Sequence, residues 1–336
     1  MNPIRSTVHS IISAAVLVWA LAGPVAGQNI LASVPIPTAS AGQVAVNPAL
    51  DLIYSGGGPN AGGTSVTVIN GSTFAVVTTI SPSAGVSADM KNDNFWAGDL
   101  TAGDVVVYNS SNTQISSTKV NSCPAAVSFD CHDRRMWVAS QCGSGNDPVW
   151  VFNADTFALI NGPITPGGTI TQPPVVDPIG SKFYVTSGGV SREIDPKTFA
   201  VSTTTFGTVL AVDSNSNKLF ATSGGNLQII NGRSGTLTKT VTLAYTPAFI
   251  GVNNAMLHVY LVNPAGNSID VYDEVGKKIT TFNLGAGNQP NGLAVDSARG
   301  RLFVDVLNTG ANTWSLNVIE DLSSVRKCGF PGGCDY

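Results

Sequence analysis

The sequence predicts an all-β, seven-bladed β-propeller with four antiparallel strands in each blade. The first observation is that an Asn or Asp is followed seven positions later by an aromatic residue in a short apolar run. This happens seven times, at Asn47/Tyr54, Asp89/Trp96, Asp130/Trp137, Asp177/Tyr184, Asp213/Phe220, Asn253/Tyr260 and Asp296/Phe303. The pairs recur at intervals of roughly forty-two residues, a fixed period that is typical of propellers and solenoids.

A second mark recurs inside the same repeats: a strand ends in an apolar or aromatic residue followed by Asn, Asp or Glu. Its members are Ile69-Asn70, Tyr108-Asn109, Phe152-Asn153, Ile194-Asp195, Ile230-Asn231, Tyr272-Asp273 and Ile319-Glu320. Around Asp296 the marks predict strands at 292–295, 301–306 and 314–319, separated by turn residues. Short strands broken by Gly, Asn, Asp and Ser indicate four-stranded antiparallel blades.

Both marks are interpreted as structural. Asn and Asp side chains bond to their own backbone two residues on and so favour tight turns. The aromatic residue of each pair is expected to pack between adjacent blades.

The ring is expected to close through its first strand. Other blades end in a fourth strand, such as 74–80 or 278–283, but the last repeat has no strong fourth strand after Glu320. Residues 29–36 resemble the missing strand, and by completing the seventh blade they would remove exposed sheet edges. The chain from Leu322 onward would lie outside the ring.

The chain divides into an N-terminal signal peptide (1–27), the propeller (28–325) and a C-terminal tail (326–336). Arg5, the apolar run 11–21 and the small residues Val25-Ala26-Gly27 are typical of a secretory signal. We therefore expect a secreted, monomeric protein, extracellular or periplasmic. No membrane span is expected in the mature chain, since no later stretch reaches ~20 apolar residues.

Charged residues make up only 11% of the chain, and the net charge is −4. No window is rich in Lys or Arg, and such a basic surface is what nucleic-acid binding requires. A nucleic-acid partner is therefore not expected.

The distance between the two marks varies from blade to blade, and the variation falls mainly in the loops between second and third strands. Variable loops on one face of a rigid ring indicate a binding face, although Gly-rich loops are equally consistent with plain flexible surface. The candidate ligand-binding residues on or near these loops are Asp99, Asp104, Asp147, Trp150, Asn263, Asn291, Asp305 and Asn308.

A calcium site is one candidate within this set, and no other cofactor is expected. Calcium takes six to eight oxygen ligands, so Asn291 and Asp305 are the candidate metal ligands, with Asn263 or Asn308 beside them. The alternative is that these side chains cap turns or meet solvent. The two histidines of the mature chain, His132 and His258, lie in turns on the opposite rim and are not placed for acid–base catalysis there.

The cysteines suggest two disulfides. Folding a hairpin around the turn at 130–134 brings Phe129 opposite Met136 and Cys123 opposite Cys142, close enough for a bridge. Cys328 and Cys334 would close a small loop in the tail, leaving Cys131 as a buried free thiol. A zinc site from Cys123, Cys131, Cys142 and His132 is conceivable, but its spacing matches no standard pattern.

The segments 289–304 (QPNGLAVDSARGRLFV), 176–185 and 269–276 resemble the YVTN-type propeller repeats of exported bacterial proteins. The likeness covers nearly the whole mature chain and implies a seven-bladed propeller without implying an activity. The step Pro290-Asn291-Gly292 is also similar to one in gluconolactonase-like propellers, where the matching Asn binds a divalent metal. That family also needs a Glu on an early inner strand, and here no Glu precedes Glu193.

Two functions follow as hypotheses. The first is a secreted, non-catalytic binding or scaffold module that recognises an unknown protein or glycan partner through its variable loop face. The alternative is a metal-dependent lactonase or hydrolase at the mouth of the central channel, acting through Asn291 and Asp305. The scarcity of His and Glu near that face favours the binding module.

Overall fold

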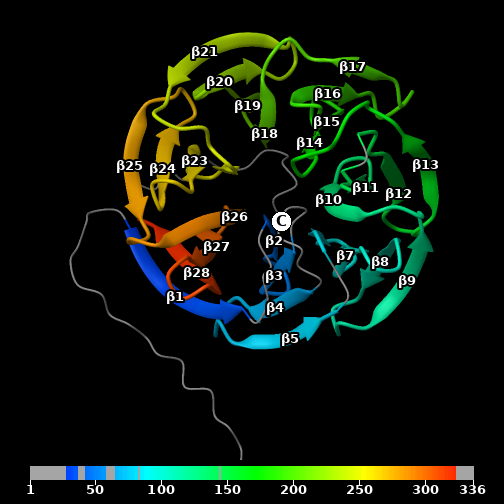
Figure 1. The fold of residues 1–336 in the computed structure, drawn as a ribbon, viewed down its shortest axis with the longest axis horizontal. Coiled ribbons are helices and arrows are strands. Elements are labelled where there is room, and N and C mark those ends of the chain that lie inside the picture. Colours follow the sequence, from blue (N-terminus) through cyan, green and yellow to red (C-terminus); the bar gives the residue numbers. More distant parts are fainter. Residues whose placement is uncertain (1–27, 37–41, 58–64, 82–83, 144, 323–336) are drawn as a thin grey trace, which may run out of the picture.

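The computed structural model describes residues 28–36, 42–57, 65–81, 84–143 and 145–322. These residues form seven four-stranded antiparallel sheets and contain no helix. The sheets stand as blades around a central channel (Figure 1). The expected seven-bladed β-propeller is therefore confirmed.

In each blade the first strand lies nearest the channel and the fourth lies on the outside. Blade 1 comprises β2 (Gly42–Asn47), β3 (Leu52–Gly57), β4 (Val66–Asn70) and β5 (Val76–Ile80). Blade 2 comprises β6 (Val86–Asp89), β7 (Asn94–Asp99), β8 (Asp104–Tyr108) and β9 (Gln114–Lys119). Blade 3 comprises β10 (Pro124–Asp130), β11 (Arg135–Ser140), β12 (Val149–Asn153) and β13 (Leu159–Ile164).

The remaining blades repeat the same order. Blade 4 comprises β14 (Val175–Asp177), β15 (Lys182–Ser187), β16 (Val190–Ile194) and β17 (Val201–Thr203). Blade 5 comprises β18 (Thr208–Asp213), β19 (Lys218–Ser223), β20 (Asn226–Asn231) and β21 (Thr236–Thr242). Blade 6 comprises β22 (Ile250–Asn253), β23 (His258–Asn263), β24 (Ser268–Asp273) and β25 (Lys278–Asn283). Blade 7 comprises β26 (Asn288–Asp296), β27 (Arg301–Asn308), β28 (Thr313–Asp321) and β1 (Gln28–Ile36).

Blade 7 joins the two ends of the propeller. β1 pairs antiparallel with β28, from Gln28 opposite Asp321 to Ile36 opposite Trp314. The expected completion of the last blade by the N-terminal strand is confirmed. Residues 1–27 and 323–336, which hold the expected signal peptide and the whole of the expected tail (326–336), lie outside the described residues.

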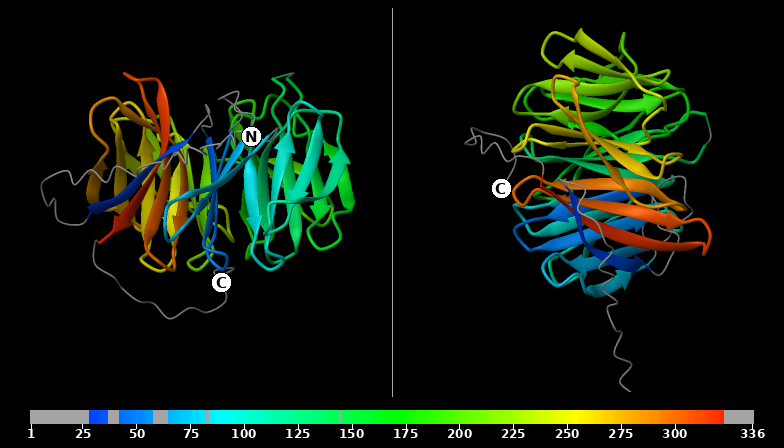
Figure 2. Two further views of the ribbon diagram at one scale, coloured as in Figure 1. Left: turned by 90° about the horizontal axis from the view of Figure 1, so that it is seen from below. Right: turned by 90° about the vertical axis from the view of Figure 1, so that its left-hand side faces the viewer.

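The ring has two distinct faces, because strands alternate in direction within every blade. We call the face with the turns from first to second and from third to fourth strands the turn rim. The opposite face, the loop rim, holds the loops from second to third strands and the links between blades. Figure 2 shows the ring edge-on, with the strands running between these two rims.

The Asn and Asp residues of the first mark shape the turn rim as expected. Their Oδ1 atoms accept backbone N–H groups two or three residues on; Asn47, for example, accepts from Ala49 and Leu50 at 3.1 Å. The same bonds recur at the other six positions, Asp89, Asp130, Asp177, Asp213, Asn253 and Asp296. The turn-forming role of these residues is confirmed.

The Asn and Asp residues of the second mark also shape turns, in six of the seven blades. Asn70, Asn109, Asn153, Asp195, Asn231 and Asp273 each accept backbone N–H groups of the following turn. Glu320, the seventh member, lies within β28.

The aromatic residues of the first mark are all buried between blades, with at most 1% of their surface exposed. Each belongs to an apolar cluster shared with the next blade. Tyr54 of blade 1 packs on Phe95 of blade 2, with ring centroids 4.6 Å apart. Trp137 of blade 3 stacks on Phe183 of blade 4 at 4.0 Å. The core is thus a ring of seven inter-blade clusters rather than one central mass.

Within the described part of the chain, no helix is long and apolar enough to span a bilayer.

Candidate functional site

The structure places the predicted binding residues around the loop rim, but it gives several of them local structural partners. Asp99 Oδ1 accepts the N–H groups of Thr101 and Ala102, both at 2.9 Å. Asn263 Oδ1 accepts the N–H of Gly266 at 3.0 Å, and Asn308 Oδ1 accepts that of Ala311 at 2.8 Å. These three side chains cap their own loops, which is the alternative to ligand binding that the sequence also allowed.

Three more predicted residues lie inside the protein or along its outer strands. Asp147 is fully buried, and its Oδ2 accepts the N–H of Ile170 at 3.0 Å. This bond fixes the long link between blades 3 and 4 against the β11–β12 loop. Trp150 is 4% exposed and packs in the cluster between blades 2 and 3. Asp104 accepts a hydrogen bond from Ser117 of the neighbouring outer strand at 2.8 Å.

The two candidate metal ligands differ in exposure. Asp305 lies on β27 and is fully buried; its Oδ1 and Oδ2 accept hydrogen bonds from Ser55 Oγ of blade 1, at 3.0 and 3.1 Å. Burial raises the pKa of Asp305 well above its usual range. Asn291 is half-buried at an irregularity in β26, and its Nδ2 donates to the Gln289 carbonyl at 3.1 Å.

No group of three or more His, Cys, Asp or Glu side chains among the described residues is arranged to hold a metal ion. Asp305 faces Ser55 across the junction of blades 7 and 1, and its burial favours the neutral carboxyl rather than the anion that calcium prefers. The gathering of Asp305 with the amides of Asn291, Asn263 or Asn308 thus remains a prediction from sequence.

The expected Cys123–Cys142 disulfide is present, with a Cα–Cα separation of 5.2 Å. The hairpin register is also as predicted, with Phe129 opposite Met136. This bond excludes the zinc site considered for these cysteines. Cys131 is disulfide-bonded as well, so the prediction of a free thiol is wrong. The expected Cys328–Cys334 loop lies outside the described residues.

Both histidines lie toward the turn rim, as expected. His132 is exposed in the β10–β11 turn, 3.1 Å from Asp133. His258 begins β23 and is buried, with its Nδ1 2.7 Å from Asp321 Oδ2; the hydroxyl of Tyr260 donates to the same oxygen at 2.7 Å. This cluster ties the end of β28 in blade 7 to blade 6.

The central channel contains a cavity of about 140 Å³ that the sequence did not reveal. It lies toward the loop rim, because most of its lining comes from the beginnings of inner strands, which all start on that face. Most of the lining residues are apolar and none is charged, although polar atoms make up more of the cavity surface than apolar ones: Gly42, Gln43, Val44, Ser128, Gln172, Pro173, Pro174, Val175, Leu210, Phe249, Ile250 and Leu293.

Two of the polar side chains in this lining are already occupied. Gln43 of blade 1 binds both backbone groups of Val127 in blade 3: its Oε1 accepts the N–H at 3.2 Å and its Nε2 donates to the carbonyl. It therefore acts like a strand partner for β10 and bridges over the short β6. Ser128 donates to the Pro174 carbonyl at 2.6 Å.

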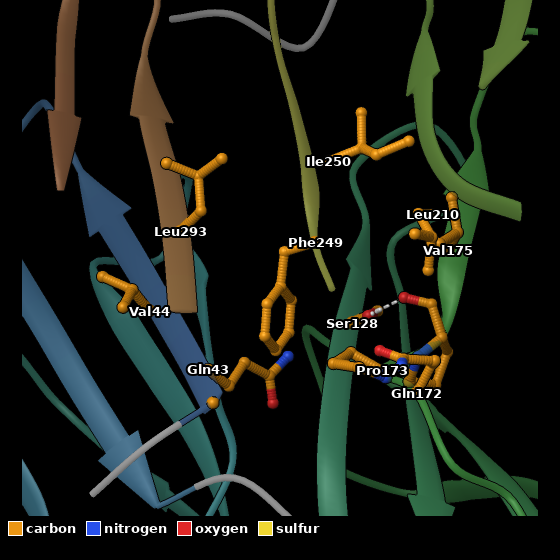
Figure 3. A pocket seen from close by; sticks show the side chains of 12 residues that line it. Gln43, Val44, Ser128, Gln172, Pro173, Val175, Leu210, Phe249, Ile250 and Leu293 are labelled. Atoms are coloured by element: carbon orange, nitrogen blue, oxygen red, sulfur yellow. Dashed lines mark hydrogen bonds between the residues drawn. The ribbon is translucent and has the colours of Figure 1, made fainter. Parts of the chain in front are cut away.

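Phe249 and Gln172 are the lining groups available to a ligand. In Figure 3 the ring of Phe249 lies between Gln43 on one side and Pro173 and Gln172 on the other. Gln172 is half-buried, and among the described residues its amide has no hydrogen-bond partner. The cavity thus offers an aromatic ring, two prolines, aliphatic side chains and one free amide, a combination that suits an apolar group with one polar contact.

No protein-family model matches the chain, and no curated protein is similar to it. The likeness to YVTN-type repeats stays a prediction, whereas the seven-bladed ring that it implies is present.

Proposed function

We propose that the protein is an exported, non-catalytic binding module that holds a protein partner at the loop rim. The partner would insert an apolar side chain into the channel cavity between Phe249, Pro173 and Leu210. The observation that carries this proposal is the cavity itself: it measures about 140 Å³, is lined mostly by apolar residues and by no charged side chain, and lies on the face that bears the variable loops.

The chemistry of the lining favours a protein partner over a glycan. A buried apolar anchor in a pocket contributes most of the free energy in many protein interfaces. A sugar ring would bring several hydroxyl groups that need hydrogen-bond partners once desolvated. Since Gln43 and Ser128 are occupied, the side chains offer mainly the amide of Gln172. A cavity of about 150 Å³ lined by aliphatic and aromatic groups is known to accept a benzene-sized molecule.

The proposal can be tested with small probes that imitate an inserted side chain. N-acetyl-phenylalaninamide and N-acetyl-leucinamide should raise the thermal unfolding midpoint of the mature protein, because they bind only the folded state. The variant Phe249→Ala should lose this shift. The matched control is Ile279→Ala, which removes an exposed aliphatic side chain from the outer strand β25 and should leave the shift unchanged.

Other outcomes would redirect the proposal. If neutral disaccharides raise the midpoint and the two amides do not, the partner is a glycan. If calcium raises it and a chelator reverses the effect, the metal-dependent lactonase or hydrolase is the better reading. If the amides stabilise Phe249→Ala as much as the parent protein, they bind elsewhere and the cavity is not the site.

A further inference from the structure

The part of the cavity wall that precedes blade 4 is a bulge in its inner strand. The link from blade 3 pairs with β15 at Ile170 and again from Val175 onward. Four residues of the link, 171–174, lie between these two points, whereas β15 has only two there, 185 and 186. Extra residues on one strand make a bulge, and prolines suit it because they have no N–H to donate. The segment Gln172-Pro173-Pro174 is thus set apart from the sheet and lines the cavity.

This bulge is held at both of its ends. Before it, the buried carboxyl group of Asp147 in blade 3 accepts the N–H of Ile170 at 3.0 Å. After it, the carbonyl of Pro174 accepts a hydrogen bond from Ser128, also of blade 3, at 2.6 Å. Gln172 therefore stands on a segment that is fixed before a ligand arrives, and such a segment loses little conformational entropy on binding.

The apolar part of the cavity is fixed as well. The ring of Phe249 lies beside the bulge (Figure 3), and the carbonyl of Phe249 accepts the N–H of Val262 in β23 at 3.0 Å. The pairing of β18 with β19 skips Leu210, which is the extra residue of a second bulge and lines the same cavity. An aromatic ring, an aliphatic side chain and a free amide are thus presented together by ordered backbone.

The hydrogen-bonding groups of the cavity decide which side chain fits it. Gln43 and Ser128 are already bonded, so the amide of Gln172 needs a partner once a ligand excludes water. A leucine or phenylalanine side chain would cover this amide without bonding to it, which is unfavourable. A histidine ring can carry a charge that no lining side chain balances. An indole ring is larger than the benzene-sized group that a cavity of this volume accepts.

We infer that the side chain inserted by the partner is a tyrosine, with its ring against Phe249 and its hydroxyl hydrogen-bonded to the amide of Gln172. A phenol hydroxyl both donates and accepts, as does a carboxamide, so either end of the amide can be its partner. Because this tyrosine occupies the cavity assigned above to the partner, the inference rests on the proposed function.

Two probes that differ only by the hydroxyl group test this match. N-acetyl-tyrosinamide should bind the protein about tenfold more tightly than N-acetyl-phenylalaninamide, because its hydroxyl gives the covered amide a hydrogen bond. Titrations followed by NMR chemical shifts measure both dissociation constants. Equal binding, or tighter binding of the phenylalanine probe, would overturn the inference and leave the proposed function standing. If neither probe binds, the proposed function fails together with the inference.

The variant Gln172→Leu tests whether this amide is the partner of the hydroxyl. It should bind both probes equally, through weaker binding of the tyrosine probe and unchanged binding of the phenylalanine probe. The matched control Gln114→Leu makes the same change on the exposed face of the outer strand β9 and should keep the tenfold preference. A tenfold preference that survives in Gln172→Leu would place the hydroxyl on another group and contradict the inference. If Gln172→Leu does not fold, the two probes on the parent protein still decide.

Discussion

At the turn rim the carboxylates of Asp89 and Asp296 are buried but have several hydrogen-bond donors each, from their own turns and from arginines. In the loop-rim half of blade 7, the equally buried Asp305 has only the hydroxyl of Ser55. The difference shows that Asp89 and Asp296 are placed where a charge can be held inside the protein, whereas Asp305 is not.

Ion pairs follow the same division. Those among the described residues lie at or toward the turn rim, except the pair of Lys278 with Asp270 on the outer strands of blade 6. Several join neighbouring blades, such as Arg134 with Asp89 and Lys218 with Glu274. The turn rim thus fixes blade against blade, whereas the channel cavity toward the loop rim has no charged side chain in its lining.

The largest expected effect comes from breaking the strongest of these ties. Arg134 donates to both oxygens of Asp89, at 2.7 and 2.8 Å, and to Asp155. Arg134→Ala should lower the free energy of unfolding by about 3–5 kcal/mol, since it leaves the carboxylate of Asp89 buried without a counter-ion. Denaturant unfolding measures the loss.

Lys91→Ala is the control for that variant. Its Nζ lies 3.8 Å from the same Asp155, but the lysine is 63% exposed, and exposed pairs contribute at most about 1 kcal/mol. If Arg134→Ala lowers the free energy of unfolding no more than Lys91→Ala does, buried ion pairs do not stabilise the turn rim.

Replacing the buried carboxyl of Asp305 should instead raise the free energy of unfolding. Burial raises the pKa of Asp305, so above pH ~4 the native state holds a proton that the unfolded chain has released. Stability therefore falls as pH rises from about 4 toward the folded pKa. Asp305→Asn should remove this slope and add roughly 2 kcal/mol at pH 8, with little change near pH 3. Unfolding curves at both pH values test it, and a variant that is less stable at pH 8 contradicts the comparison.

The smallest effect concerns backbone shape at the turn rim. Six of the seven first turns hold a non-glycine residue at φ of about +50 to +60°, among them Leu257 at 59°, while Gly300 fills the seventh at 64°. Leu257→Gly should stabilise the fold by about 1 kcal/mol, because an L side chain is strained there. Gly300→Ala should cost a similar amount. Chemical denaturation of the two variants measures both changes in the free energy of unfolding. If both variants are stabilised, or both are destabilised, backbone strain is not the cause.

Much of the turn rim could be predicted because its determinants are local. Asn47 and its equivalents bond within three residues, and each aromatic partner lies at a fixed spacing from them. The pairing of β1 with β28 was predictable for a related reason, since one blade visibly lacked a strand. Cys123 and Cys142 followed from the register of a single hairpin.

The channel could not be predicted, because its lining comes from six different blades. Phe249 and Gln172 stand just before inner strands, and no local pattern shows that they meet. Asp305 and Asp147 looked accessible because a sequence does not show what packs over a strand or loop. Asp305 faces a serine some 250 positions away. Cys131 looked unpaired because nothing in the sequence around it shows a partner.

The pairing of β1 with β28 also sets the order in which the protein can be assembled. β1 is synthesised before the other described strands, yet its partner strand β28 is the last of them to be made. Blades 1 to 6 are built from consecutive strands and can form from local hairpins, whereas blade 7 needs strands from both ends of the propeller. Because contacts of such long sequence separation form slowly, ring closure is the natural rate-limiting event of folding. Until then β28 presents an unpaired edge, which makes the interval before closure the period of greatest exposure to misassembly.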